Sequence, residues 1–331
     1  MTSSNPVTAD PSRILDIATG YMGAQQLFAA SRIGLFTALA EGGRTVAQIA
    51  RTTGVSERMS RILADAMAGL GLLTREDGRY TLTETSQAYL TGGRAQLDLS
   101  PFLTFLAEIS YPHWLQFPRT VDTDQPGDLG MTDERWKTFL AGVMTYNQLH
   151  ADMFAGALDF SGHTNALDLG GLAPYFAIRA MQANPDLKTT FVYAPDFTEA
   201  VNQQLAEAGL ADRSVVEAVD TATAEPKGPF DLVFVNHVIH RFSVEENRAI
   251  FKHARAAASA GARLAVLDFY LDDDAQQRPI DALHAGEYLV IDGTVVFPEA
   301  EVRSWLVEAG WKPLETVALP GSPRVLLAEA I

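Results

Sequence analysis

The sequence contains no cysteine. A disulfide framework, a thiolate metal site and a cysteine nucleophile are therefore excluded. Basic residues are scarce as well: 25 Lys and Arg residues stand against 41 Asp and Glu residues, which gives a formal net charge of −16. Because such an acidic chain repels phosphate backbones and anionic lipid, we expect neither nucleic acid nor membrane as a partner.

Long apolar runs are also missing. No stretch of about 18 consecutive apolar residues occurs, so no membrane span is predicted. The N-terminal residues 1–13 lack the basic and apolar blocks of a secretory signal. The chain has 331 residues, of which 47% are hydrophobic, enough for two domains with a sizeable core. We therefore expect a cytoplasmic enzyme or binding protein.

The first half of the chain is predicted to be mostly helical. Residues 13–42 carry apolar side chains at helical spacing and very few charges, which favours helices buried on more than one side. Because this apolar surface would be exposed on a monomer, we predict a homodimer formed through this segment and neighbouring helices. Residues 91–130, with frequent glycine and proline, are predicted to be irregular, and residues 132–158 to be helical.

Residues 45–90 follow the order of a winged helix-turn-helix. A short helix, a turn at Gly54 and a second helix that starts near Ser56 precede a hairpin whose turn is Asp77-Gly78. Such a motif can bind DNA. However, acidic residues accompany the arginines of the second helix, and the whole chain is acidic, so an architectural or dimerisation role is favoured.

From residue 164 the pattern changes to short apolar strands that alternate with helices. The predicted strands read "TNALDLG", "TTFVYAP", "FDLVFVNHV" and "RLAVLDFYL". This alternation predicts a parallel sheet covered by helices on both faces. We therefore divide the chain into a helical domain at 1–160 and an α/β domain at 161–331.

The stretch "ALDLGGLAPYFAI" at 166–178 begins like a nucleotide-binding loop. Ligands of such sheets bind at the carboxyl ends of the strands, where glycines let the backbone approach and free amides at a helix N-terminus face the ligand. Gly170 and Gly171 fit this pattern, whereas Leu172 and Pro174 stand where further glycine is usual. The alternative is a strand-to-helix turn that serves only packing.

Four segments together resemble one family: "TVAQIARTTGVSERMSRILADAMAGLGLL", "ALDLGG", "FDLVFVNHVIHRFSVEENRAIFKHARAAASAGARLAVLDF" and "FPEAEVRSWLVEAGW". From about residue 15 onward the chain is similar to the class I S-adenosylmethionine-dependent O-methyltransferases of bacterial and plant secondary metabolism. The resemblance implies a mostly helical winged-helix dimerisation domain followed by a Rossmann-like α/β methyltransferase domain. It also implies a homodimer, S-adenosylmethionine as cofactor and a small-molecule natural product as substrate.

The resemblance assigns cofactor contacts to Asp168, Gly170, Gly171, Leu172, Tyr193, Asp220 and Asn236. Two of these depart from the family pattern: Tyr193 replaces the carboxylate that holds both ribose hydroxyls, and Leu172 replaces a glycine. A phenol holds one ribose hydroxyl where a carboxylate holds two, and a lost charged hydrogen bond costs about 1.5–3 kcal/mol. Because Tyr193, Leu172 and Pro174 act together, we predict that S-adenosylmethionine binds weakly, if at all.

The segment "NHVIHRFSVEEN" at 236–247 resembles the catalytic element of the family. His240 falls on the base that takes the proton from a substrate hydroxyl, and imidazole suits this role because histidine titrates near neutral pH. Asp268 corresponds to the acid that orients the base. Arg241 stands where the family has an aspartate and is kept as a catalytic candidate. The alternative for His240 is a strand-end histidine that bonds only to the backbone.

A metal site is the other interpretation of these histidines. His237 and His240 have the spacing of a helical metal pair, but at a strand end their side chains are expected to diverge. His284 and Glu287 could add ligands. Because a metal usually needs three or four converging ligands, we predict no metal site.

Substrate contacts are predicted at Phe102, Phe105, Trp114, Met144, Tyr146, His237 and Glu287. For most of the aromatic residues among them, helix core is the alternative. Two functions stay nearly level. One is methyl transfer to a hydroxyl of an aromatic or polyketide-like substrate with His240 as base. The other is a methyltransferase-like enzyme that has lost normal S-adenosylmethionine use and catalyses a pericyclic, cyclisation, decarboxylation or other acid-base reaction. A third possibility is a winged-helix regulator.

Overall fold

The computed structural model describes residues 9–273 and 277–331; residues 1–8 of the N-terminal stretch discussed above lie outside it. The chain forms two compact units. One comprises the chain up to Tyr111 together with Thr132–Thr145, and the other comprises Pro112–Met131 together with Tyr146–Ile331. The division between 160 and 161 remains a prediction. Within the described ranges, no helix is long and apolar enough to cross a membrane.

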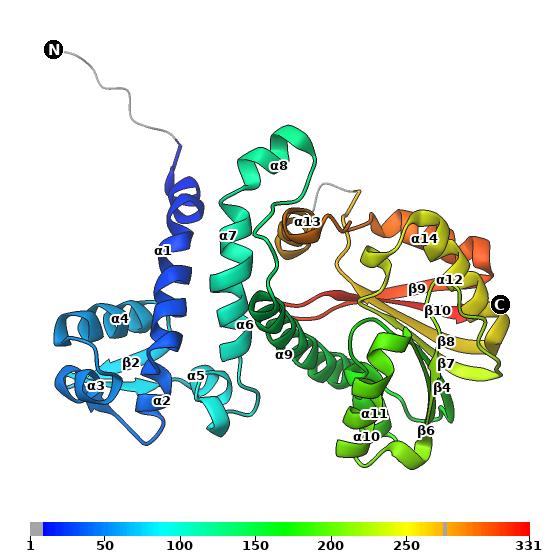
Figure 1. The fold of residues 1–331 in the computed structure, drawn as a ribbon, viewed down its shortest axis with the longest axis horizontal. Helices are drawn as coiled ribbons and strands as arrows, with labels where there is room; N and C mark the ends of the chain where they lie inside the picture. The colour runs from blue at the N-terminus through cyan, green and yellow to red at the C-terminus, as the bar shows by residue number, and fades with distance from the viewer. Residues whose placement is uncertain (1–8, 274–276) are drawn as a thin grey trace. The chain divides into compact units, whose positions relative to one another are not determined.

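The first unit is mostly helical and contains a small antiparallel sheet (Figure 1). Its helical elements are α1 (Ser12–Arg32), α2 (Leu35–Leu39), α3 (Val46–Thr53), α4 (Glu57–Gly69), α5 (Glu84–Tyr89), η1 (Gly92–Arg94), α6 (Ser100–Phe105), the π-helical η2 (Leu106–Ser110) and the N-terminal part of α9 (Asp133–Ala157). The strands β1 (Arg44–Thr45), β2 (Leu73–Glu76) and β3 (Arg79–Leu82) pair in the order β1-β3-β2.

The winged-helix order predicted for residues 45–90 is confirmed. The Ser56 hydroxyl accepts a hydrogen bond from the Met59 amide and caps the start of α4. Asp77 and Gly78 have φ values of 48° and 73°. Two residues with positive φ form the tight turn that joins β2 to β3 in a hairpin.

The prediction that residues 91–130 are irregular is wrong. This segment contains η1, α6, η2, α7 (Tyr111–Trp114) and α8 (Phe117–Thr123). Pro101 and Pro118 occupy the first turns of α6 and α8. A proline there removes no helical hydrogen bond, so these prolines start helices instead of breaking them. The helix predicted at 132–158 is confirmed as α9.

The second unit is built on a seven-stranded sheet covered by helices (Figure 1). The strands are β4 (Asn165–Leu169), β5 (Lys188–Tyr193), β6 (Ser214–Ala218), β7 (Phe230–Asn236), β8 (Ala258–Asp268), β9 (Trp311–Ala318) and β10 (Arg324–Ala330). Their order is β6-β5-β4-β7-β8-β10-β9; the first five are parallel, and β10 is antiparallel to both neighbours. This confirms the predicted Rossmann-like α/β fold, although β6, β9 and β10 were not predicted.

The helices of this unit cover both faces of the sheet. Besides α8 and the C-terminal part of α9, they are α10 (Tyr175–Ala183), α11 (Thr198–Glu207), α12 (Val244–Ala257), α13 (Pro279–Asp292) and α14 (Glu299–Ala309), with short turns η3 (Pro195–Phe197), η4 (Ala211–Arg213) and η5 (Ile239–Arg241). Leu167 and Leu169 of β4 join the core that contains α12 and α14, whereas Ala166 joins the core of α10 and α11. Because side chains alternate along a strand, Asp168 lies on the α10–α11 face.

Candidate active site

The candidate site lies at the carboxyl ends of the parallel strands, where β7 ends at Asn236 and β8 ends at Asp268. The backbone turns sharply after β7, because His237 adopts a left-handed φ of 53°, which is uncommon for a residue with a side chain. The His237 amide donates to the Leu267 carbonyl at 2.8 Å and holds this turn against β8. His240 follows in the single turn of η5.

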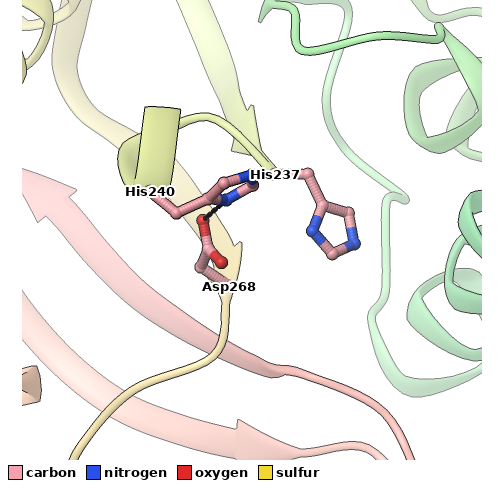
Figure 2. Close-up of side chains that lie close together, drawn as sticks. All are labelled: His237, His240 and Asp268. Carbon is pink, nitrogen blue, oxygen red and sulfur yellow. Dashed lines mark hydrogen bonds and ion pairs between the residues drawn. The ribbon is translucent and has the colours of Figure 1, made fainter. Parts of the chain in front are cut away.

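His240 and Asp268 form a direct hydrogen bond. The Nδ1 of His240 lies 2.8 Å from the Oδ2 of Asp268, and Figure 2 shows the ring facing the carboxylate. Burial alone would raise the pKa of the Asp268 carboxyl, but the neighbouring charge and the hydrogen bond of His240 lower it below its usual value. The carboxylate is therefore ionised and accepts the Nδ1 hydrogen, which leaves Nε2 of His240 to accept a proton.

His237 lies beside this pair, but its hydrogen-bond partner is a residue that was not predicted from the sequence. Its Nε2 is 2.9 Å from the Nδ1 of His150, which α9 contributes. Burial lowers the pKa of His237 to about 4 and lowers that of His150 well below its usual value, so both rings are neutral at neutral pH. The signal available was the spacing from Tyr146, because residues four apart on a helix share one face.

The expectation that His237 and His240 diverge is wrong. Nitrogen and oxygen atoms of His237, His240 and Asp268 lie within 4.8 Å of one another, because His240 belongs to a helical turn and not to a strand. However, His240 and Asp268 are hydrogen-bonded to each other, and Nε2 of His237 is engaged with His150. We interpret the group as proton-transfer machinery, and the absence of a metal remains a prediction.

An aromatic wall adjoins His240; it consists of Tyr146, Phe269, His284 and Tyr288. The ring centroid of Tyr288 lies 4.5 Å from that of His240. Phe269 and His284 stack with their centroids 3.7 Å apart, and Phe269 meets Tyr288 at 5.9 Å. The ring centroid of Tyr146 lies 3.9 Å from that of His150 and 6.3 Å from that of His284. This arrangement offers flat apolar surfaces close to the candidate base.

The other predicted substrate residues fall into two groups. Trp114 and Glu287 lie in the same unit as His240, and the indole Nε1 donates to the Glu287 carboxylate. Phe102, Phe105 and Met144 belong to the first unit. There the Phe105 side chain packs directly on Gly142, where an added Cβ would lie 2.2 Å from the Phe105 Cβ and 2.8 Å from its ring, and Phe105 is buried, so it is a core residue. The roles of all five in substrate binding remain predictions.

The loop after β4 contacts the end of β7 through Gly171. A Cβ on Gly171 would lie 2.8 Å from the His237 carbonyl oxygen and 3.1 Å from that of Asn236. The side-chain Oδ1 of Asn236 accepts from the Leu267 amide at 3.1 Å, and its buried Nδ2 has no hydrogen-bond partner. Beyond Gly171, Leu172 is half-buried, and Pro174 directly precedes α10.

The remaining cofactor and catalytic candidates take different positions. Asp220 is exposed, and its Oδ1 accepts from the Ala222 amide in a turn after β6. Arg241 is exposed at the end of η5. Tyr193 and Asp168 are both buried, and the Tyr193 hydroxyl donates to the Oδ2 of Asp168 at 3.1 Å. Asp168 and Tyr193 are therefore hydrogen-bonded to each other.

Comparison with known proteins decides the family. Residues 15–92 match the O-methyltransferase dimerisation domain, and residues 117–312 match the O-methyltransferase domain. The chain is 31% identical over 97% of its length to 3-hydroxy-5-methyl-1-naphthoate 3-O-methyltransferase of Streptomyces sahachiroi, of which it covers 96%. The chain belongs to the O-methyltransferase family.

Two further relatives agree with this assignment. The tetracenomycin polyketide synthesis 8-O-methyltransferase TcmO of Streptomyces glaucescens is 25% identical, with 94% of both chains covered. The S-adenosylmethionine-dependent methyltransferase SibL, in its apo form, superposes with a TM-score of 0.84 at 26% identity, with coverage of 97% of this chain and 99% of SibL. The predicted family, fold and cofactor, S-adenosylmethionine, are confirmed. The comparisons give no support to lost methyl transfer or to a winged-helix regulator.

The residues of this O-methyltransferase fit the cofactor only in part. The unpartnered Nδ2 of Asn236 is a buried donor that suits a polar ligand at the strand ends. By contrast, the face of Gly170, the side on which a Cβ would stand, is not open to a ligand. A Cβ on Gly170 would meet ring carbons of Tyr193 at 2.0–2.4 Å, so the phenol ring already covers this glycine.

Proposed function

We propose that this O-methyltransferase methylates a phenolic hydroxyl of an aromatic natural product, with His240 as general base and Asp268 as the residue that positions it. The observation that carries the proposal is the partly buried 2.8 Å hydrogen bond between His240 and Asp268 next to the aromatic wall. S-adenosylmethionine supplies the methyl group.

The proton chemistry follows from the hydrogen bond. The Asp268 carboxylate accepts the Nδ1 hydrogen and so holds His240 in the tautomer whose Nε2 carries a lone pair. Nε2 would take the hydroxyl proton as the substrate oxygen bonds to the methyl carbon, while the carbon–sulfur bond of S-adenosylmethionine breaks and S-adenosylhomocysteine leaves. The imidazolium that results lies against an ionised carboxylate, which stabilises its positive charge.

The substrate class is supported by two observations. The relative with 31% identity is named for a hydroxynaphthoate, a fused aromatic ring with a hydroxyl group. In this chain, the half-buried rings of Tyr146, His284 and Tyr288 would provide faces against which such a substrate stacks. Trp114, His237 and Glu287 are retained as further contacts, together with Phe102, Phe105 and Met144.

The test is an assay of the purified enzyme with S-adenosylmethionine and a hydroxynaphthoate, followed by mass spectrometry for the O-methylated product. We expect His240→Ala to lower kcat by about 10²–10⁴-fold, the usual scale of acid-base catalysis. His240→Gln should be nearly as slow, because an amide cannot take up the proton. His163→Ala, outside the site, serves as the control. A His240→Ala enzyme that loses stability but keeps full turnover would show that His240 is structural.

We also infer that the protein is a homodimer formed through residues 13–42. The support is the match of residues 15–92 to a dimerisation domain and the exposed apolar side chains of α1, namely Ile14, Leu15, Ile17, Tyr21 and Met22. An apolar surface of this kind is typical of a protein interface.

A further inference from the structure

The phenol ring of Tyr193 lies directly on the backbone of Gly170. These residues are neighbours across β4 and β5, because the Gly170 amide donates to the Val192 carbonyl at 3.1 Å. The Cβ direction of Gly170 points at the ring, with the nearest ring carbons at 2.0, 2.3 and 2.4 Å. Real Cβ atoms do not approach other atoms this closely, so the ring occupies the space that the missing side chain leaves.

The far end of the same ring is anchored. Asp168 precedes Gly170 by two residues and lies on the same face of the sheet. Its Oδ2 accepts the hydrogen bond of the Tyr193 hydroxyl at 3.1 Å, and the two residues are 3% and 1% exposed. Burial raises the pKa of the Asp168 carboxyl to about 7, so this carboxyl gains little from ionisation where it lies. Tyr193 is thus held at both its ring and its hydroxyl.

The loop that follows β4 is held in place by residues that follow the end of β6. The Thr221 hydroxyl, which follows β6, donates to the Gly170 carbonyl at 3.1 Å, and Thr221 is buried. The Val219 amide donates to the Tyr193 carbonyl at 3.0 Å. Because the backbone is fixed on both sides of the ring, the face of Gly170 can open only through movement of the Tyr193 side chain.

In a sheet of this kind the ligand binds at the carboxyl ends of the strands, where the bare face of a glycine allows close approach. We propose that the Tyr193 ring and the nucleoside of S-adenosylmethionine compete for the face of Gly170, so that Tyr193 sets the affinity of this enzyme for its cofactor. Binding then requires the ring to leave Gly170 and its hydroxyl to leave Asp168. This inference rests on methyl transfer as the proposed function.

Competition of this kind lowers the apparent affinity. The observed dissociation constant equals the intrinsic one divided by the fraction of molecules in which the ring is displaced. A side chain that is buried and anchored at both ends keeps this fraction small. Tyr193→Ala removes the ring, and Tyr193→Asp removes it and adds a carboxylate for the ribose hydroxyls. Both changes should therefore tighten binding.

The experiment is calorimetry of the full-length protein with S-adenosylhomocysteine, which binds without reacting. We expect Tyr193→Ala to bind about 10-fold more tightly than the wild type and Tyr193→Asp about 10–100-fold more tightly. Tyr80→Phe is the matched control, since it removes another tyrosine–aspartate hydrogen bond, to Asp65 in the first unit, and should bind like the wild type. Weaker binding by a folded Tyr193→Ala, or equal binding by the wild type and Tyr193→Asp, would overturn the proposal.

A second measurement observes the wild-type protein. Labelling with fluorotyrosine gives a fluorine resonance for each of the nine tyrosines, and the resonance of Tyr193 is the one that Tyr193→Phe lacks. Saturating S-adenosylhomocysteine should move this resonance towards the position of an exposed tyrosine. A Tyr193 resonance that stays unchanged at saturation refutes the displacement. Failure of the proposed function would look different. Tyr193→Asp would bind S-adenosylhomocysteine tightly, but no variant would methylate a hydroxyaromatic compound.

Discussion

The Nδ1 of His150 lies 2.9 Å from the Nε2 of His237, and both rings are buried. One ring therefore donates and the other accepts, and neither carries a proton on both nitrogens. Burial is the main reason that the pKa of each is low, with the value for His237 near 4. The pair is a neutral link between α9 and the end of β7.

This pair makes the fold sensitive to acid. A histidine with a depressed folded pKa contributes stability that is present above its unfolded pKa of about 6.5 and is lost as the pH falls towards the folded pKa. In His150→Gln, one of the two titrating groups is absent. We expect its free energy of unfolding to fall less than that of the wild type between about pH 7.5 and about pH 5. Urea unfolding at the two pH values checks this, and an equal or larger fall contradicts it.

Asp168 acts in the opposite direction over the same pH range. Burial raises its pKa to about 7, so the folded state binds a proton that the unfolded state releases above about pH 4. The contribution of Asp168 to stability therefore grows as the pH falls through 7. Asp168→Asn removes this gain. Between about pH 7.5 and about pH 5, the free energy of unfolding of the variant should therefore fall by about 2 kcal/mol relative to that of the wild type. Curves of the free energy of unfolding against pH that run parallel for the variant and the wild type would rule this out.

Asp268→Asn should slow catalysis without weakening cofactor binding. The amide no longer provides the negative charge that fixes the His240 tautomer and stabilises the imidazolium, so kcat should fall by about 10²–10⁴-fold. Calorimetry with S-adenosylhomocysteine should give an affinity within about threefold of the wild type. Asp231→Asn, which removes one of the two carboxylate oxygens that accept from the Thr164 and Asn165 amides, is expected to lower stability and leave turnover of the folded protein unchanged. Unaltered kcat in Asp268→Asn argues against a role for Asp268 in positioning His240.

Gly171 should not tolerate a side chain. A Cβ there would lie 2.8 Å from the His237 carbonyl oxygen, a backbone atom that cannot move without disturbing β7. We expect Gly171→Ala to lower the free energy of unfolding by about 1–3 kcal/mol. Gly156→Ala is the control: no atom lies within 4 Å of its Cβ direction in α9, so alanine should stabilise the helix by up to about 1 kcal/mol. Equal effects of the two changes would remove the steric explanation.

The homodimer can be tested on α1. Ile14 and Ile17 are 72% and 67% exposed in the single chain. Ile14→Glu combined with Ile17→Glu should convert the dimer to a monomer in light scattering, because two charges would be buried without partners at the interface. Val307→Glu on α14 changes a residue that is 60% exposed in the other unit and should leave the dimer intact. A wild-type protein that is monomeric at micromolar concentration excludes the interface altogether.

The sequence predicted the parallel part of the fold well, because its strands are short apolar runs between helices. It missed β6, β9 and β10; the residues of β6 and β9 are mostly half-buried or exposed and do not form an apolar run. It also misread residues 91–130, where Pro101 and Pro118 lie in the first turns of α6 and α8. Glycine and proline mark boundaries, but they do not say on which side of a boundary the helix lies.

The candidate site was predictable where a residue matched a family position and not where it depended on packing. His240 and Asp268 are 28 residues apart and were selected from flanking motifs, and they lie at hydrogen-bond distance. His150 belongs to no such motif and reaches His237 only because α9 packs on the sheet. Tyr193 was identified as a substitution, but its ring position depends on the register of β4 and β5, which the sequence does not state.

The contact between Gly170 and Tyr193 also restricts the order in which the two positions can change. While residue 193 is tyrosine, any side chain at 170 would start 2.0 Å from its ring. A smaller residue at 193 removes that obstacle, so substitutions that are harmful at 170 in the present background become tolerable afterwards. The effects of the two changes are therefore not additive. A change at 193 therefore alters what a later change at 170 does to the fold, whereas a change at 170 that comes first meets the Tyr193 ring.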